Sequence, residues 1–307
     1  MTQMSVQWAE LLEPIVKKIF YVQYDGLTEA SLIPRLFDVA TSSLPSEEAV
    51  GVGGRGNFKE FTNQRLEYQD FDEGFSTTLT PKEYTDAMSI TRKMWDDDQR
   101  GVMKRQARQF GDAAARTRED HAASVFNNAF SSSYVGGDSV ALCSASHPLS
   151  PSNASVQSNA GSTALSYNAV NSTWDLMKDF TDDKGKKIRV QPNLLLIPRQ
   201  LEGEANEIVN TMRGSNTQQP GTSDYAANIV QKRAITYAVW EELTDTKNWF
   251  LIDEGRIKDF LLWYDRVPME FTLDPQSDFN LRALYRAYMR YSYGWINWTW
   301  LYGHNVT

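Results

Sequence analysis

A glycine-rich run near residue 50 is the first stretch whose residue types could do chemistry. It matches G-x-G-x-x-G at Gly51, Gly53 and Gly56. That pattern holds a dinucleotide phosphate when a strand precedes it and a helix follows it. Here the polar residues 46–48 precede the run and residues 57–59 (NFK) follow it. The sequence around the motif therefore favours a flexible loop over a dinucleotide site.

A cysteine and a histidine lie four residues apart at Cys143 and His147. A thiol beside an imidazole can act as a nucleophile with its base, so a hydrolase is one alternative. Pro148 and a run of Ser and Ala around the pair favour an incidental placement in a loop. His121 and His304 are too far apart in the sequence to indicate a metal site. We expect no catalytic residue, no metal and no cofactor.

Charged residues cluster between positions 96 and 120. Asp96, Asp97 and Asp98 could bind a hard cation, although the exposed start of a helix explains them as well. The basic residues that follow are Arg100, Lys104, Arg105, Arg108, Arg116 and Arg118. This basic face could meet nucleic acid, or it could form ion pairs between subunits. We expect mainly ion pairs, with acids that include Asp70, Asp72, Glu73 and the run 96–98.

A long helix must position these charges. Small or apolar residues recur at spacings of three and four over residues 90–130, which is one stripe of a helix. The stripe consists of Met103, Ala107, Phe110, Ala114, Thr117, His121 and Val125. A helix of about 30 residues spans about 45 Å, so it should act as a strut beside a sheet. The aspartates 96–98 are expected in its first turn.

The composition is that of an ordinary globular protein with many aromatic residues. The 307 residues carry a net charge of −8, and 9 Trp, 14 Tyr and 14 Phe are present. Aromatic side chains supply large interface area, and the negative charge disfavours tight wrapping by nucleic acid. The single cysteine excludes an intrachain disulfide. We see no signal peptide and no transmembrane run, and we expect no membrane partner.

The first 90 residues divide into two expected parts. Residues 1–48 are typical of an arm that lies on something larger, with a helix that Pro14 limits. Residues 49–79 predict a long hairpin, with a turn at residues 72–74 (DEG) and polar residues on both faces. A two-stranded ribbon is marginal alone. The hairpin should therefore lie on a neighbouring subunit through Phe58, Phe61, Tyr68 and Phe71.

The rest of the chain predicts an α+β unit followed by long strands. Residues 131–165 read as loops, and a helix should run from about 166 to about 183. A short buried strand is expected at 193–198, strands are expected at 235–239 and 249–252, and a helix at 199–212. Residues 213–228 are polar and should form an exposed loop containing Gly214, Pro220 and Gly221. From 281 to 293 every second residue is apolar, with Arg282, Arg286 and Arg290 on the other face, which predicts a strand.

The order of these parts resembles the major capsid proteins of tailed bacteriophages, which have the HK97-type fold. Local strings that are similar to the family are SASHPL at 144–149, NLLLIPRQLEGEANEIV at 193–209 and YSYGWINWTWLYG at 291–303. The resemblance implies an α+β fold with an N-terminal arm (1–48), an E-loop hairpin (49–90), a P domain with a long spine helix (91–131 and 266–307) and an A domain (132–265). It also places the loop 213–228 at a capsomer axis. The lysine–asparagine crosslink of one family branch has no identifiable acceptor here.

The resemblance implies a function in assembly. The protein would form hexamers and pentamers of itself and build an icosahedral shell around double-stranded DNA, which it would contact weakly. A separate scaffolding protein is expected, because the chain begins at Met1 and few residues precede the spine helix. A portal and a decoration protein are the other expected partners. It would be assembled in the host cytoplasm and end in the virion. A cellular encapsulin-type compartment is the alternative within the same fold.

Overall fold

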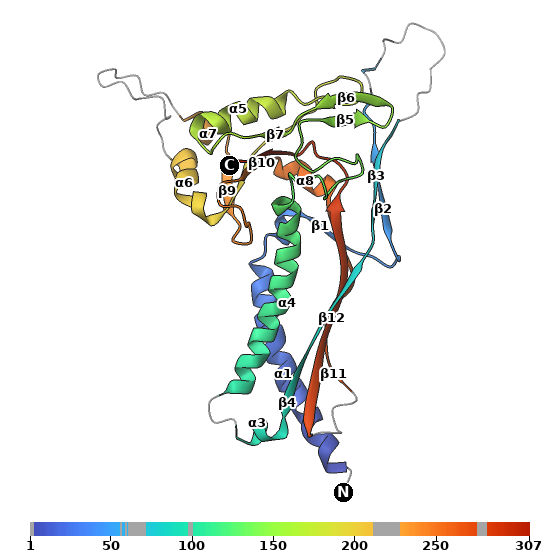
Figure 1. The fold of residues 1–307 in the computed structure, drawn as a ribbon, viewed down its shortest axis with the longest axis vertical. Coiled ribbons are helices and arrows are strands. Elements are labelled where there is room, and N and C mark those ends of the chain that lie inside the picture. Colours follow the sequence, from blue (N-terminus) through green and yellow to red (C-terminus); the bar gives the residue numbers. More distant parts are fainter. Residues whose placement is uncertain are drawn as a thin grey trace, which may run out of the picture.

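The computed structural model describes residues 3–55, 57–58, 60, 72–97, 101–210, 228–274 and 281–307. Two parts stand out in Figure 1. A long stalk holds two helices beside extended strands, and a head sits at one end of it. The N-terminus lies at the free end of the stalk, and the C-terminus lies in the head.

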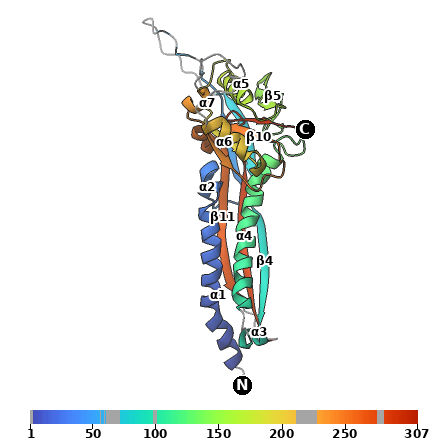
Figure 2. The same cartoon turned by 90° about the vertical axis from the view of Figure 1, so that its left-hand side faces the viewer.

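The stalk is built on a four-stranded sheet with the order β1-β11-β12-β4. Its strands are β1 (Asp38–Thr41), β4 (Lys82–Thr91), β11 (Leu261–Leu273) and β12 (Arg282–Trp295). β1 pairs with β11 in parallel, and the other neighbours are antiparallel. Along β12 the predicted alternation is confirmed, because Ala283, Tyr285, Ala287, Met289 and Tyr291 are buried. Long helices cover one face of this sheet (Figure 2).

The long helix is α4 (Val102–Asn127), whose 26 residues span about 39 Å. The predicted stripe is confirmed by the burial of Met103, Ala107, Ala114 and Val125. The predicted start is wrong, because β4 continues to Thr91 and the short helix α3 (Arg92–Asp96) follows it. Gly101 is the residue that precedes α4, and its φ of +67° is a left-handed conformation that glycine adopts at little cost.

The aspartate run therefore does not form the first turn of the long helix. Asp96 closes α3 and forms an ion pair with Arg92 at 2.9 Å, and α4 has no acidic residue in its first turn. Thr91 caps α3 by accepting a hydrogen bond from the amide of Met94.

The N-terminal segment forms a 27-residue helix, α1 (Gln3–Glu29), which contains Pro14. The prediction that Pro14 limits the helix is wrong. Pro14 lies on the exposed face of α1. Leu12 and Val16, which precede and follow it in the sequence, are buried, and their packing offsets the cost of about 3 kcal/mol of a proline inside a helix. Leu12, Val16, Phe20 and Tyr24 are buried on the opposite face, and Phe20 stacks on Phe271 of β11 at 4.4 Å. As predicted, the segment lies on something larger, which is the stalk of its own subunit (Figure 2).

A five-stranded sheet with the order β7-β13-β10-β8-β9 forms the centre of the head. Its strands are β7 (Ala160–Gly161), β8 (Leu194–Ile197), β9 (Thr236–Val239), β10 (Trp249–Ile252) and β13 (Leu301–His304). β8 is buried along its whole length, which confirms the buried strand predicted at 193–198, and β9 and β10 confirm the strands predicted at 235–239 and 249–252. β13 is also fully buried and was not predicted as a strand. Four helices and one 3-10 turn surround the sheet: α5 (Tyr167–Lys178), η1 (Arg199–Leu201), α6 (Glu202–Asn210), α7 (Ile229–Lys232) and α8 (Glu254–Phe260).

Two expectations for the head need correction. Residues 144–165 are not all loop, because β5 (His147–Ser150) and β6 (Asn153–Gln157) form an antiparallel pair. The helix α5 ends at Lys178, and residues 181–187 form a separate turn with Gly185 at φ +72°. The turn is closed by the amide of Asp182, which donates to the carbonyl of Lys186 at 2.8 Å.

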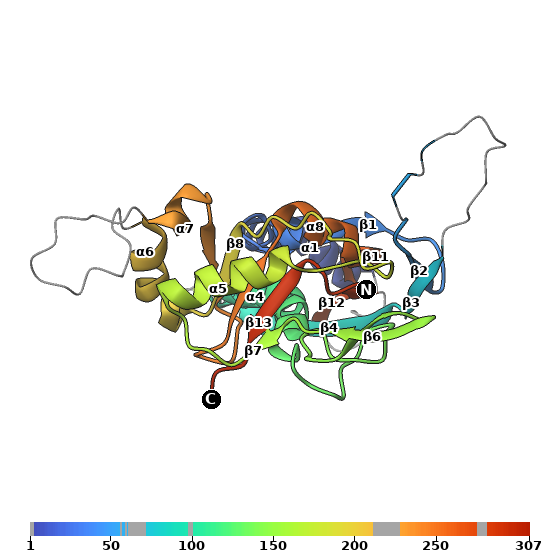
Figure 3. The ribbon, with the colours of Figure 1, turned by 90° about the horizontal axis from the view of Figure 1, so that it is seen from above.

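The strands β2 (Glu47–Val52) and β3 (Glu73–Leu79) form a two-stranded antiparallel ribbon beside the head. Seen from above, the ribbon lies at the end of the molecule opposite α6 and α7 (Figure 3). The predicted turn at residues 72–74 is wrong, because Glu73 and Gly74 already belong to β3. Gly74 lies so close to Gly51 that a Cβ would come within 2.6 Å of its backbone, so the glycines serve strand pairing here.

The predicted domain division stays a prediction, but one boundary fits the strands poorly. β4 lies in the range 49–90, yet it pairs with β12 over ten residues in the stalk sheet. The hairpin part of that range therefore ends near Leu79, where β3 ends.

Candidate functional site

The proposed nucleophile pair is not assembled. Cys143 is buried, and burial raises the pKa of its thiol, which disfavours the thiolate. His147 is buried between Asp138, 2.6 Å from its Nδ1, and Asn159, 3.1 Å from its Nε2, and it stacks on Trp298. Among the described residues no hydrogen bond joins His147 to Cys143. A structural role within the head explains both side chains.

The three histidines lie in separate surroundings. His121 contacts the hydroxyl of Tyr291 in the stalk at 2.6 Å. His304 contacts the hydroxyl of Thr173 at 2.8 Å and stacks on Trp249 at 4.1 Å. Burial lowers the pKa of His304 to about 4, so it is neutral at neutral pH. Within the described ranges no cluster of three or more ligands could hold a metal ion.

The glycine-rich run lies at the end of the ribbon. Gly51 belongs to β2, and Gly53 and Gly54 follow it, whereas Gly56 lies outside the described residues. No helix follows among the described residues 57–58 and 60, as a dinucleotide loop would require. A Cβ at Gly54 would come within 2.5–2.7 Å of the carboxylates of Asp182 and Asp183. These glycines therefore allow the ribbon to approach the head closely.

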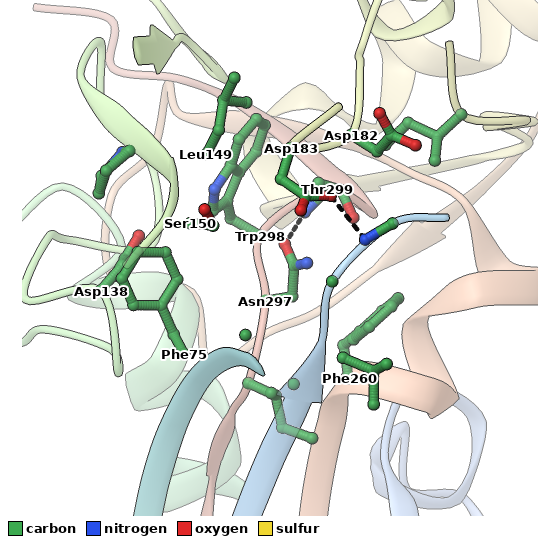
Figure 4. Close-up of a pocket in the computed structure, with 18 of the residues that line it drawn as sticks. Phe75, Asp138, Leu149, Ser150, Asp182, Asp183, Phe260, Asn297, Trp298 and Thr299 are labelled. Atoms are coloured by element: carbon green, nitrogen blue, oxygen red, sulfur yellow. Dashed lines mark hydrogen bonds between the residues drawn. The ribbon is translucent and has the colours of Figure 1, made fainter. Parts of the chain in front are cut away.

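A cavity of about 180 Å³ lies where the ribbon meets the head (Figure 4). The ribbon contributes Gly51, Gly53, Gly54 and Phe75, and the turn after α5 contributes Asp182 and Asp183. In Figure 4 the carboxylate of Asp183 points toward the backbone that continues from β2. The amide of Gly54 donates to Asp183 Oδ1 at 2.5 Å.

Most of the predicted hairpin contacts cannot be placed. Phe61, Tyr68 and Phe71 lie outside the described residues. Phe58 is 92% exposed, and Val50 and Val52 on β2 are 53% and 72% exposed. Ala49 and Leu79 at the base of the ribbon are buried with Leu262 of β11. The base thus rests on its own subunit and Phe75 is half-buried against the head, while Val50, Val52 and Phe58 are exposed.

The predicted basic face of the long helix divides into two kinds of residue. Lys104, Arg105, Arg108 and Arg116 are exposed, and no ion pair to another described residue is formed by any of them. Arg100 lies outside the described residues. We call the four exposed side chains the basic face of α4.

Two of the acids expected to pair with this face are engaged elsewhere in the subunit. Asp72 forms an ion pair with Lys184, and Asp96 forms one with Arg92. Asp70 and Asp98 lie outside the described residues. Within the subunit these two acids therefore pair with nearer cations, and the pairing of the basic face with acids of the same or neighbouring subunits stays a prediction.

Arg118 does not belong to the basic face. Its guanidinium makes a two-pronged contact with the carboxylate of Asp265 at 2.9 and 3.0 Å, and it lies over the rings of Trp263 and Tyr291. Hydrogen bonding to Asp265 and nearby charge raise the pKa of Arg118 although burial opposes them. The sequence held a signal that was missed: Arg118 is four residues from both Ala114 and Ala122, which are buried.

Gly214, Pro220 and Gly221 of the predicted capsomer-axis loop lie outside the described residues. The described loop that sequence reasoning missed is the turn 181–187, which carries Asp182 and Asp183. Its composition, DDKGKK, predicted only a helix end.

A groove of about 430 Å³ separates α4 from the β4 side of the stalk sheet. Its lining is mostly apolar and includes Phe110, Ala114, Met269 and Met289, with Glu83 and Asp86 also present.

None of the described helices is long and apolar enough to cross a membrane.

A family model matches the chain in sequence, and solved structures match it in fold. A model of the phage capsid protein family matches residues 74–303. No curated protein matches the chain significantly.

Three solved capsids have a similar fold at low sequence identity. The decorated capsid of bacteriophage JBD30 is 16% identical with a TM-score of 0.55, and the match covers 70% of this chain and 91% of that one. The capsid of a native GTA particle is 13% identical with a TM-score of 0.56, covering 90% and 89%. The capsid of cyanophage P-SCSP1u is 12% identical with a TM-score of 0.58, covering 90% and 88%.

Proposed function

Because the chain belongs to the phage capsid protein family, we propose that its copies assemble into a closed icosahedral shell around double-stranded DNA. It is a structural capsid protein with the HK97-type fold. The finer statement, a shell of hexamers and pentamers of this chain with no catalytic role, is our proposal. The observation that carries it is the ribbon, which presents apolar side chains outside the core of its own subunit.

The ribbon supports a contact between subunits. Val50, Val52 and Phe58 are more than half exposed, and apolar side chains that gather outside a core are typical of interaction sites. A two-stranded ribbon gains little from its own pairing and needs a partner surface. We place Phe58, Phe61, Tyr68 and Phe71 at the contact with a neighbouring subunit.

The basic face of α4 supports a second contact. Lys104, Arg105, Arg108 and Arg116 are exposed, and no ion pair within the described part of their own subunit involves them. We assign them to acids of neighbouring subunits, each pair contributing about 0–1 kcal/mol. Raising the ionic strength should then weaken empty shells, while free subunits should bind duplex DNA only weakly at physiological salt. Tight DNA binding that is lost on Arg105→Ala and Arg108→Ala would instead make this face a nucleic-acid site.

The remaining parts of the proposal rest on the family resemblance. The loop 213–228, with Gly214, Pro220 and Gly221, would meet its own copies around a capsomer axis. Its glycines and proline suit a position that tolerates more than one geometry. A scaffolding protein, a portal and a decoration protein are the proposed partners, with assembly in the host cytoplasm. The viral shell is preferred over an encapsulin-type compartment because the matched family is one of phage capsid proteins.

Negative-stain microscopy of the purified protein tests the proposal. We expect closed shells or capsomer-sized rings that depend on concentration and salt. A monodisperse monomer under all conditions would contradict it. The variant Cys143→Ala tests the hydrolase alternative, because a shell protein should assemble as before when this buried thiol is removed.

A further inference from the structure

The turn 181–187 contacts the chain just after β2 and just before β3, at one end of the ribbon. On the β2 side, the amide of Gly54 donates to Asp183 Oδ1 at 2.5 Å. On the β3 side, the carboxylate of Asp72 forms an ion pair with the ammonium group of Lys184. The two strands are also joined there by the amide of Gly53, which donates to the carbonyl of Asp72 at 2.8 Å. Two neighbouring residues of one turn therefore hold both strands.

The turn itself is rigid. The carboxylate of Asp182 accepts hydrogen bonds from the amides of Lys184 at 3.0 Å and Lys186 at 2.7 Å. Gly185 provides the left-handed residue that closes the loop. Since the side chain of Asp182 is used inside the turn, Asp183 and Lys184 are the residues presented to the ribbon.

The head fixes the turn from the other side. Asn153 of β6 donates to the carbonyl of Asp183 at 2.9 Å. The side-chain amide of Gln157 donates to the carbonyl of Thr181 at 2.9 Å and accepts from its amide at 3.1 Å. The β5–β6 pair, the turn and the ribbon thus form one chain of contacts, as the approach of Asp183 to the blue strand in Figure 4 illustrates.

The glycines of the ribbon are required by this contact. A Cβ at Gly53 would come within 2.8 Å of the carbonyl oxygen of Asp72, and one at Gly54 within 2.5 Å of Asp182 Oδ2. The side chain of Asp183 is only 4% exposed, and its partners are the amide of Gly54 at Oδ1 and the ammonium group of Lys184, 4.0 Å from Oδ2. The motif that resembles a phosphate loop thus places the backbone amide of Gly54 against a carboxylate of the same chain.

We propose that Asp183 and Lys184 are the positioning residues that set the direction in which the hairpin leaves the subunit, so that it reaches its neighbour at a fixed angle. The contact with a neighbouring subunit rests on the assembly function proposed above. The positioning of the ribbon is a property of the free subunit and can be measured without assembly. At the opposite end of the two strands, Ala49 and Leu79 are buried with Leu262, and Tyr264 and Ile296 pack against them. Along its length, β3 also packs against β5 and β12. Asp183 and Lys184 act at the other end, next to Gly54 and Asp72.

Spin labels on the free subunit test the positioning directly. Val52→Cys on the ribbon and Ala154→Cys on β6 are exposed sites, and the native Cys143 is buried and should not be labelled. The wild-type background should give one narrow distance distribution. Asp183→Ala should broaden it at least twofold, whereas Asp183→Asn, which keeps an acceptor oxygen for the Gly54 amide, should leave it narrow. An unchanged distribution in Asp183→Ala would overturn the proposal.

A charge exchange provides a second test that does not disturb a buried group. Asp72 and Lys184 are both 44% exposed, so single changes at either should leave the subunit folded. Asp72→Lys and Lys184→Asp should each broaden the distribution, and the double variant should restore it. Failure of the double variant to restore a narrow distribution would count against the pair as a positioning contact.

Assembly gives the third readout. The variants with a broadened distribution should yield at least tenfold fewer closed shells than Asp183→Asn. A wild-type protein that forms no shells would contradict the assembly function and leave the positioning to be judged on the distance measurements. Normal shells from a subunit with a broadened distribution would refute the role in assembly.

Discussion

The stalk and the ribbon use the same kinds of residue in opposite ways. In the stalk, Phe20 is fully buried between α1 and the sheet, where it contacts Phe110 and Phe271. On the hairpin, Phe58 is 92% exposed. The stalk sheet has four strands and two long helices against one face, while the ribbon has two strands and a base cluster of three buried residues.

The difference indicates where each part obtains its stability. The stalk and the head bury their apolar side chains within one subunit and should fold without a partner. The ribbon makes polar contacts with the turn 181–187, and its side chains Val50, Val52 and Phe58 remain exposed. Its stability should therefore depend on assembly.

The sharpest version of this comparison is a pair of phenylalanine substitutions. Phe20→Ala should lower the free energy of unfolding of the subunit by about 3–5 kcal/mol, because it opens a cavity in a packed core. Phe58→Ala should change it by less than about 0.5 kcal/mol, because the ring is exposed in the free subunit, yet it should reduce shell formation. Urea denaturation and particle counts measure the two effects. A large loss of subunit stability in Phe58→Ala would break the comparison.

The ion pair between α4 and β11 gives the next effect. Arg118→Leu should cost about 3 kcal/mol, because it leaves the carboxylate of Asp265 buried without its cation. The figure is at the low end of the usual range since the Asp265 side chain is 16% exposed. Arg116→Ala, two residues away and exposed, is the matched control and should change subunit stability by less than about 0.5 kcal/mol. Equal effects from both variants would mean that Arg118 is not part of the stalk core.

Acid should weaken the head through His304. Burial lowers the pKa of His304 to about 4 in the folded state, whereas the unfolded chain takes up a proton near pH 6.5. The free energy of unfolding is therefore unaffected above pH 6.5, falls as the pH drops below it, and levels off near pH 4. The loss should reach about 2 kcal/mol at pH 5. His304→Gln, which cannot titrate, should show a flatter profile between pH 6.5 and 4, and an identical slope would refute the assignment.

Sequence patterns predicted the elements that repeat a simple period. The alternation from Ala283 to Tyr291 and the helical spacing from Met103 to Val125 each recur over many residues, and burial on one face follows directly. The buried strand at 194–197 was found from its continuous apolar run. These elements are set by neighbours in the sequence.

Features that depend on distant partners could not be predicted. Pro14 stays inside a helix because Leu12 and Val16, on the opposite face, are buried in the core. Arg118 is buried because it pairs with Asp265, which is 147 residues away in the sequence. Strand β3 pairs with residues 47–52 and not with the residues directly before the predicted turn at 72–74. The role of Asp183 depends on Gly54, 129 residues away, so the polar composition of its turn gave no sign of it.

Hydrogen exchange of the ribbon amides tests the central claim most directly, since the ribbon should be completed by a neighbouring subunit. The amides of β2 and β3 are followed in the free subunit and in assembled shells, with those of β11 and β12 as the internal control. We predict that assembly slows exchange in the ribbon at least tenfold and leaves the central stalk strands nearly unchanged. Ribbon amides that are already as protected in the free subunit as in the shell would contradict the account.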